Sequence, residues 1–195
     1  MFKLGLLAIL LHDTGYLKTR DDIEGTGAKY TLIHVNGSAE FAATLLGEKG
    51  YTQKDIAAVQ NMIRCTGVNV DLAALRFHDE LERTVGYALG TADLLGQMAA
   101  PDYVEKLPIL YQEFAESERF NAGNKVPRAV FSSAQDLIQK TPTFWRKYVM
   151  PRVEKDFQGL YRYLCQPYPD GSSYFLDCIK ANIERVGRQL STSAV

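Results

Sequence analysis

His12 and Asp13 directly follow the apolar stretch Leu4–Leu11 and are the first candidate functional residues in this sequence. Neighbouring residues on a helix project about 100° apart, so the pair can share one ion only if the ion lies between them and other helices complete its coordination. Imidazole and carboxylate together favour a borderline or hard divalent cation, such as manganese, iron, magnesium, nickel or zinc. The pair therefore predicts a metal site at a helix end, although the dipeptide alone also occurs by chance.

Two later residues share helix faces with small or apolar neighbours. His34 has the spacing of one face with Ser38 and Ala42, so we expect its ring to point toward the core. A hydrogen-bonded core histidine is the alternative to a functional one. Asp93 shares a face with Leu89, and a carboxylate in such surroundings is costly unless it is paired or bound to a metal. Pairing with an arginine or with a helix terminus is the alternative there.

Two other motifs predict structural roles. His78-Asp79 lies in the polar run Arg76–Arg83 without an apolar helix before it, so we expect Asp79 to cap a helix. Gly25-Thr26-Gly27 lacks the preceding strand and the later glycine or Gly-Lys of nucleotide-binding loops. It therefore predicts a turn.

The segment Leu6–Tyr16, with its apolar helix, His-Asp, small residue and glycine, resembles the signature of the HD superfamily of metal-dependent phosphohydrolases. Three later features match the same family in the same order, and the resemblance covers about Gly5 to Phe114. They are His34 with Ser38, the helix end Ile63–Thr66, and Thr91–Leu94.

The resemblance implies that His12, Asp13 and Asp93 are metal ligands, and that Asp13 also bridges a second ion or orients the attacking water. It implies that His34 binds a second metal ion or the phosphate. The implied reaction is hydrolysis of a phosphomonoester or phosphodiester, most simply of a nucleotide, by a metal-activated water.

Substrate contacts are expected from residues close to these positions. Lys18 and Arg20 follow the pair closely enough to contact a substrate phosphate, because cations stabilise the charge that develops on transferring oxygens. Solvated loop cations are the alternative. Thr66, expected to point inward from its helix, is the third candidate for substrate binding.

The family motif begins with a histidine on an earlier helix, and no histidine precedes His12. One interpretation is that the chain begins inside the family domain, which would leave the first apolar segment exposed and favour self-association. A second is that His34 or a residue of a partner chain supplies the ligand. A third is a degenerate domain that binds a nucleotide or a protein without turnover.

The composition limits the class of protein. A chain of 195 residues with 46% hydrophobic residues can form a globular domain with a large core. With 22 basic and 23 acidic residues, it offers no electrostatic argument for a nucleic-acid polymer or an anionic membrane. Its three widely spaced cysteines predict reduced thiols in the cytoplasm. The first apolar segment is too short to span a bilayer and predicts a buried core helix.

Hydrophobic periodicity predicts an all-α fold. The resemblance implies an HD-type helical bundle in residues 1–121, and we expect residues 122–195 to form a C-terminal helical extension. The stripe of the helix over 79–98 is expected to be Leu81, Val85, Ala88, Ala92 and Leu95. Pro108 and Pro151 are expected to break or kink helices. The aromatic residues after Phe144 predict helix packing or, alternatively, a homodimer contact. The other predicted helices span residues 32–47, 52–66, 102–119, 127–140, 142–164 and 173–190.

Overall fold

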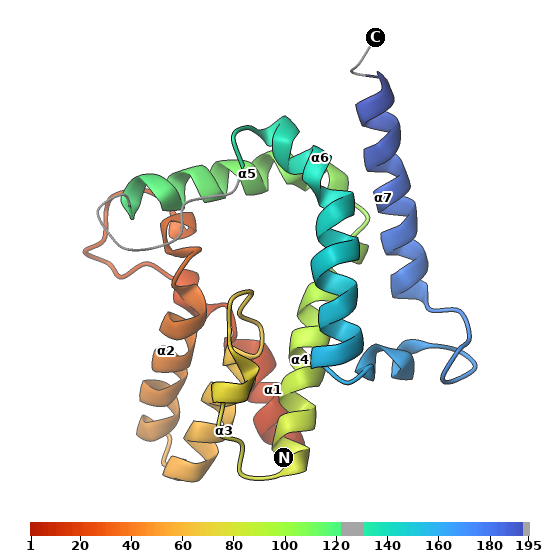
Figure 1. Ribbon diagram of the computed structural model, residues 1–195. Coiled ribbons are helices and arrows are strands. Elements are labelled where there is room, and N and C mark those ends of the chain that lie inside the picture. Colours follow the sequence, from red (N-terminus) through yellow and green to blue (C-terminus); the bar gives the residue numbers. More distant parts are fainter. Residues whose placement is uncertain (122–130, 193–195) are drawn as a thin grey trace. The chain divides into compact units, whose positions relative to one another are not determined.

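The computed structural model describes residues 1–121 and 131–192, and this part of the chain is helical, without a strand (Figure 1). The predicted all-α class is therefore confirmed. The α-helices are α1 (Phe2–Leu11), α2 (His34–Glu48), α3 (Gln53–Arg64), α4 (Glu80–Ala99), α5 (Tyr103–Phe120), α6 (Ala134–Phe144) and α7 (Tyr174–Thr192). None of the described helices is long and apolar enough to cross a bilayer.

The chain divides into two compact units. The first unit consists of Met1–Gly90 with Glu116–Val126, and the second of Thr91–Ala115 with Pro127–Val195. Helices α4 and α5 each contribute one part to each unit, whereas the sequence predicted a single boundary after residue 121. The predicted helix start at Pro127 lies outside the described residues.

The second unit contains helices that continue through proline. In α5, Pro108 lies inside the helix, where the sequence predicted a break or a kink. Helix α6 includes Pro142, which the sequence predicted to begin a new helix. After α6 the helical run continues as two π-helical turns, Trp145–Val149 and Arg152–Asp156, on either side of Pro151. Because proline lacks an N–H group and its ring crowds the preceding turn, the wider π-helical spacing accommodates it without ending the helix.

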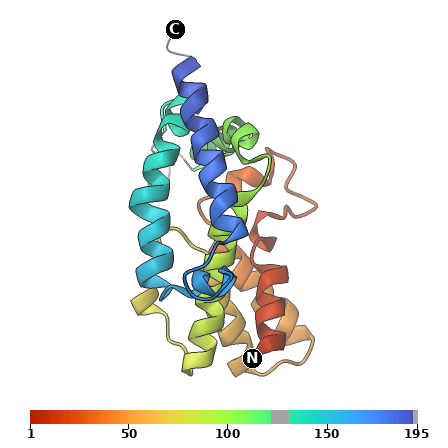
Figure 2. The ribbon, with the colours of Figure 1, turned by 90° about the vertical axis from the view of Figure 1, so that its right-hand side faces the viewer.

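Helices α6 and α7 of the second unit lie side by side (Figures 1 and 2). Buried Asn182 on α7 donates to the carbonyl oxygens of Met98 (2.9 Å) and Ala100 (2.9 Å), where α4 ends. These bonds satisfy two carbonyls that have no partner within their own helix. The cysteines are free thiols, as predicted, and Cys65 and Cys165 are buried.

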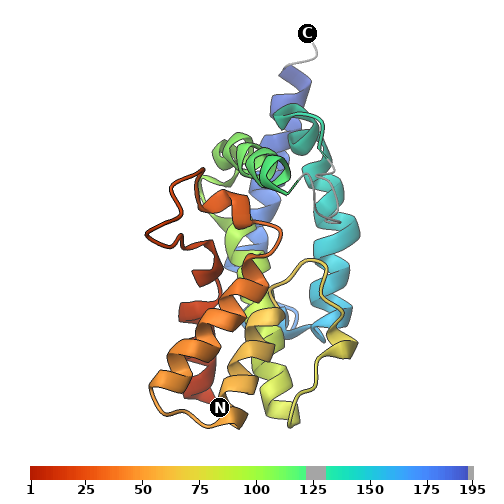
Figure 3. The ribbon, with the colours of Figure 1, turned by 90° about the vertical axis from the view of Figure 1, so that its left-hand side faces the viewer.

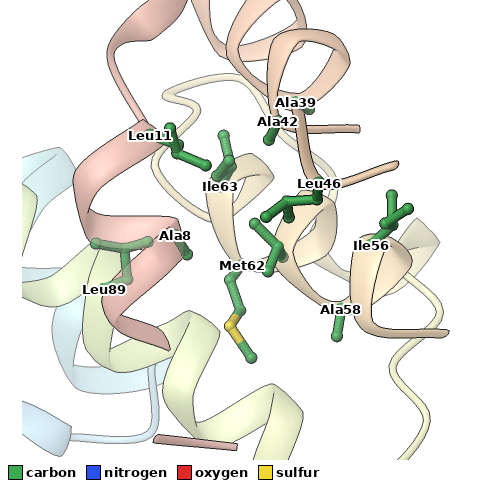
Figure 4. Packing of buried hydrophobic residues seen from close by; sticks show 11 residues of the cluster. Ala8, Leu11, Ala39, Ala42, Leu46, Ile56, Ala58, Met62, Ile63 and Leu89 are labelled. Carbon is green, nitrogen blue, oxygen red and sulfur yellow. The ribbon is translucent and has the colours of Figure 1, made fainter. Parts of the chain in front are cut away.

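The core of the first unit lies between α1, α2 and α3. Helices α2 and α3 lie side by side (Figure 3), joined by a turn in which Gly50 has a positive φ of 75°. Thr52 caps α3 by accepting from the Asp55 amide (3.1 Å), as its sequence position predicted. Figure 4 shows the packed residues, each large one contributing about 1.5–3 kcal/mol by burial. They include Ala8, Leu11, Ala39, Ala42, Leu46, Ile56, Ala58, Met62, Ile63 and Leu89.

Helix α1 buries a narrow face and exposes several of its large residues. Its buried residues are Gly5, Ala8 and Leu11, whereas Phe2 and Leu10 are 80% and 75% exposed. A side chain on Gly5 would meet Val85 of α4 at 2.7 Å, so the helix can approach its neighbour only without one. The prediction of a buried core helix therefore holds for one narrow face.

The buried face of α4 differs from the predicted stripe. Leu81, Ala88 and Ala92 are exposed, whereas Leu95 is buried as predicted. The other buried residues include Glu82, Gly86 and Leu89, which lie outside the predicted stripe. A side chain on Gly86 would meet the Cys65 sulfur of the helix C-cap of α3 at 2.9 Å. Helix α4 therefore packs closely against α3 at Gly86, a residue that a count of apolar side chains does not include.

Candidate functional site

His12 and Asp13 directly follow α1, where the last turn of the helix fixes the His12 ring. His12 Nδ1 is 2.8 Å from the Ile9 carbonyl oxygen, one turn back. This bond leaves the other ring nitrogen, Nε2, 3.2 Å from Asp13 Oδ2. The adjacent pair therefore brings an imidazole nitrogen and a carboxylate oxygen together at the end of an apolar helix.

His34 joins this pair from the first residue of α2. Its Nδ1 is 2.7 Å from the Thr31 carbonyl oxygen, the same arrangement that holds His12. Its Nε2 is 3.8 Å from Asp13 Oδ1. We call His12, Asp13 and His34 the HDH cluster. The two histidines approach different oxygens of one carboxylate, and all three residues belong to the first unit.

The protonation states of the cluster suit metal binding. The hydrogen bond with His12 lowers the pKa of the Asp13 carboxyl, so the carboxylate is ionised at neutral pH. Burial lowers the pKa of the His34 ring, which favours the neutral imidazole. An ionised carboxylate and a neutral imidazole are the forms that bind a divalent cation.

The turn after Asp13 packs on α2. The Gly15 amide donates to the hydroxyl of buried Ser38 (2.8 Å), and the Tyr16 ring stacks on the His34 ring with centroids 4.2 Å apart. A side chain on Gly15 would lie 2.0 Å from the His34 carbonyl oxygen, so only glycine fits. The contacts of Ser38 and Tyr16 were not predicted from the sequence. Gly15, shortly after His12-Asp13, was the one residue that indicated a close approach.

The loop that follows is held by a buried lysine. Lys29 forms an ion pair with Asp22, and its carbonyl oxygen accepts from Ser117 (3.3 Å) at the end of α5. The predicted turn at Gly25-Thr26-Gly27 is confirmed: Thr26 caps a short 3-10 helix, and its hydroxyl donates to Glu116 (2.9 Å). This long connection is therefore ordered by contacts within the first unit.

Two of the three residues predicted to bind substrate make hydrogen bonds within the chain, and the third is exposed. Lys18 donates to the carbonyl oxygens of Glu24 (3.0 Å) and Gly25 (2.6 Å) in its own loop. Arg20 is exposed. Thr66 is buried, and its hydroxyl donates to the Ile63 carbonyl (2.8 Å). Their contact with substrate stays a prediction.

The geometry of the HDH cluster can be compared with that of a bound ion. Two donor atoms that each lie about 2.0–2.2 Å from one cation are about 3 Å apart, which matches the 3.2 Å between His12 Nε2 and Asp13 Oδ2. His34 Nε2, at 3.8 Å, would have to move closer. Within residues 1–121 and 131–192, no three His, Cys, Asp or Glu side chains already form a metal-binding group. Two donors thus fit an ion directly, and the third lies nearby.

Asp93, the remaining predicted ligand, lies half-buried on α4 in the second unit. Asp93 has an interaction of its own. Its part in a metal site stays a prediction.

The second His-Asp dipeptide has the predicted structural role. Asp79 Oδ1 accepts from the Glu82 amide (2.8 Å), so Asp79 caps the start of α4. Glu82 is fully buried, and its two carboxylate oxygens accept from the His78 amide (3.0 Å) and the Asn61 side chain (3.1 Å). These bonds differ from a capping box in that Glu82 accepts from the amide of His78, one residue before the cap Asp79, and also from the Asn61 side chain.

Comparison with known proteins assigns a family to most of the chain. Residues 5–167 match the model of the Npun_R2479-like family. The chain belongs to the Npun_R2479-like family. The matched residues of this family include the whole HDH cluster, both His-Asp dipeptides and Asp93. No curated protein and no solved structure matches the chain.

Proposed function

We propose that this protein is a metal-dependent phosphohydrolase, that His12, Asp13 and His34 hold its divalent cation, and that its substrate is a phosphomonoester or phosphodiester such as a nucleotide. The observation that supports the proposal is the approach of two imidazole Nε2 atoms to one carboxylate. The substrate class rests on the resemblance of Leu6–Tyr16 to the HD signature.

The hydrogen bonds of the two rings explain why a cation suits this place. A carbonyl oxygen only accepts, so both rings carry a proton on Nδ1, and Nε2 is the nitrogen that can bind a cation once it is deprotonated. In the metal-free chain, His12 Nε2 contacts Asp13 directly, and a cation held between the two side chains would replace this contact. Backbone carbonyls that fix the ring in this way are a common support of metal-binding histidines.

The donor set accepts several divalent ions. Two imidazole nitrogens and a carboxylate suit manganese, iron, nickel and zinc, and magnesium through the carboxylate and water. When bound, such an ion lowers the pKa of a coordinated water toward neutrality.

The residues of the chain have separate tasks in this proposal. The Asp13 side chain is 59% exposed, so one of its oxygens can accept a hydrogen bond from an attacking water and receive its proton. His12 and His34, at 22% and 21% exposure, are held by their Nδ1 bonds and supply fixed nitrogen donors. Lys18 and Arg20 remain candidates to neutralise phosphate charge if the loop rearranges.

The test is metal binding and hydrolysis by the full chain. Metal-stripped protein is titrated calorimetrically with manganese and then assayed on p-nitrophenyl phosphate, bis-p-nitrophenyl phosphate, nucleotides and cyclic nucleotides. We expect stoichiometric manganese and activity on at least one ester. His34→Gln should weaken both, whereas His78→Gln, the same change at an exposed histidine outside the cluster, should change neither.

Absence of both metal binding and hydrolysis in the unmodified protein would overturn the proposal. The same preparation then tests the non-catalytic alternative. A module that binds a nucleotide without turnover would be stabilised thermally by that nucleotide, and the stabilisation would persist in EDTA. A shift that disappears with EDTA supports the metal-dependent site.

A further inference from the structure

The position of His34 depends on residues outside the HDH cluster. Asp13 and His34 are separated by a long connection and lie on different elements, so each must be placed independently. Three contacts fix the His34 ring: its Nδ1 bond to Thr31 (2.7 Å), its approach to Asp13 and the Tyr16 ring stacked on its face. The stack is nearly parallel, with 18° between the planes.

Tyr16 is itself placed by the turn that follows Asp13. Thr14–Tyr16 is one turn of 3-10 helix, and the Tyr16 amide donates to the Asp13 carbonyl (3.1 Å). The turn is joined to α2 by the bond from the Gly15 amide to Ser38. Because Ser38 lies one helical turn after His34, this bond connects the turn after His12-Asp13 to the helix that carries His34.

The turn at Gly15 packs closely against α2. Gly15 lies against Gly37, whose own Cβ would be 3.4 Å from the Gly15 Cα, and Ser38 is 0% exposed. A Cβ on Gly37 would make only ordinary contact, whereas a Cβ on Gly15 would lie 2.8 Å from the Ser38 amide nitrogen, so the turn requires glycine at position 15.

From these contacts we infer that Tyr16 and Ser38 are the positioning residues of the site: Ser38 anchors the turn to α2, and Tyr16 holds the plane of the His34 ring so that Nε2 faces Asp13. Neither is a catalytic residue. The inference rests on the proposed function for its consequence in metal binding, but the ring position can be measured in the metal-free protein.

The first measurement is ¹⁵N NMR of the histidine rings in the full, metal-free chain, which has only three histidines. In the unmodified protein, the Nδ1 and Nε2 signals of His34 should be well separated, as expected for one tautomer. Tyr16→Leu should bring them together as the ring gains freedom, and Tyr16→Phe should keep them apart because the stack remains. Tyr174→Leu, at an exposed tyrosine of α7, is the matched control and should leave them unchanged.

The second measurement is manganese affinity. Loss of a residue that supports a metal ligand typically costs 10–100-fold, so Tyr16→Leu and Ser38→Ala should each raise the manganese Kd about 10-fold, and Tyr16→Phe should not. Ser38→Ala should also speed hydrogen exchange of the Gly15 amide. Circular dichroism and thermal unfolding establish that each variant is folded.

The two measurements separate this inference from the proposed function. If Tyr16→Leu keeps the separated His34 signals of the unmodified protein, the positioning role is overturned, whatever the metal affinity. If the unmodified protein binds no manganese, the proposed function is overturned and the spectra alone decide the inference. A collapsed His34 signal pair in Tyr16→Leu with retention in Tyr16→Phe supports it in either case.

Discussion

The chain contains the same dipeptide twice, and its two copies have different roles. His12-Asp13 follows the last residue of α1, and both side chains face one another with His34 nearby. His78-Asp79 precedes the first residue of α4, where Asp79 binds a backbone amide and His78 is exposed. The dipeptide itself therefore has no fixed meaning, and its place relative to a helix decides its role.

The physical difference lies in what each helix end leaves unpaired. A helix start presents free N–H groups, which an aspartate satisfies directly. A helix end presents free carbonyl oxygens, one of which binds His12 Nδ1, so that Nε2 faces Asp13. The carboxylate at this end has no amide to bind and approaches imidazoles instead. The same two side chains thus form a cap at one end and a candidate cation site at the other.

The largest expected effect is on hydrolysis. Asp13→Asn should lower kcat/KM by about 1,000-fold, within the range for loss of a general base, because the neutral amide neither binds the ion well nor accepts a proton. Asp79→Asn, the same change in the second dipeptide, should leave kcat/KM unchanged. Steady-state kinetics on the best ester of the panel measure both. Equal loss in the two variants would remove the distinction between the dipeptides.

The next effect is on metal affinity. His12→Gln should raise the manganese Kd by about 100-fold, because it removes the donor that already lies at an ion-compatible 3.2 Å from Asp13. His78→Gln keeps the backbone amide that binds Glu82 and should leave the Kd unchanged. Calorimetric titration distinguishes the two. A Kd unaffected by His12→Gln would place the ion elsewhere.

The sequence predicted those parts of the molecule that depend on local pattern. The all-α class and the Thr52 and Asp79 caps follow from spacing and from the groups that helix ends leave unpaired. The grouping of His34 with His12 and Asp13 was implied by the resemblance and not by spacing. The predicted buried face of α4 was wrong in part, because Gly86 allows a close approach that a count of apolar residues ignores.

Other parts depend on contacts between distant segments. The stack of Tyr16 on His34 and the bond from Gly15 to Ser38 join two elements, so neither residue alone carries a signal. The continuation of the helical run through Pro151 depends on π-helical turns that no periodicity of 3.6 residues reveals. The resemblance in sequence indicated which residues are candidate ligands, but not the residues that hold them in place.

The third effect tests Glu82, the buried carboxylate that binds the His78 amide of the second dipeptide. Glu82→Gln should lower the free energy of unfolding by about 2 kcal/mol, because both carboxylate oxygens accept, and one would be replaced by an NH₂ group that faces another donor. Urea unfolding followed by circular dichroism measures the change. Glu80→Gln, at an exposed residue of the same helical turn, is the matched control and should stay near the unmodified value. Unchanged stability in Glu82→Gln would contradict a stabilising role for the two hydrogen bonds of Glu82.

The smallest effect compares the two aspartates directly. Asp79→Ala should lower the free energy of unfolding by about 1 kcal/mol, since it leaves an amide at the start of α4 without its cap. Asp13→Ala should lower it much less in EDTA, because Asp13 is largely exposed and a negative charge after a helix end opposes the helix dipole. With saturating manganese, the unmodified protein gains stability and Asp13→Ala does not, so the order of the two variants reverses. If Asp13→Ala were the more destabilised without metal, the first dipeptide would also be a structural element.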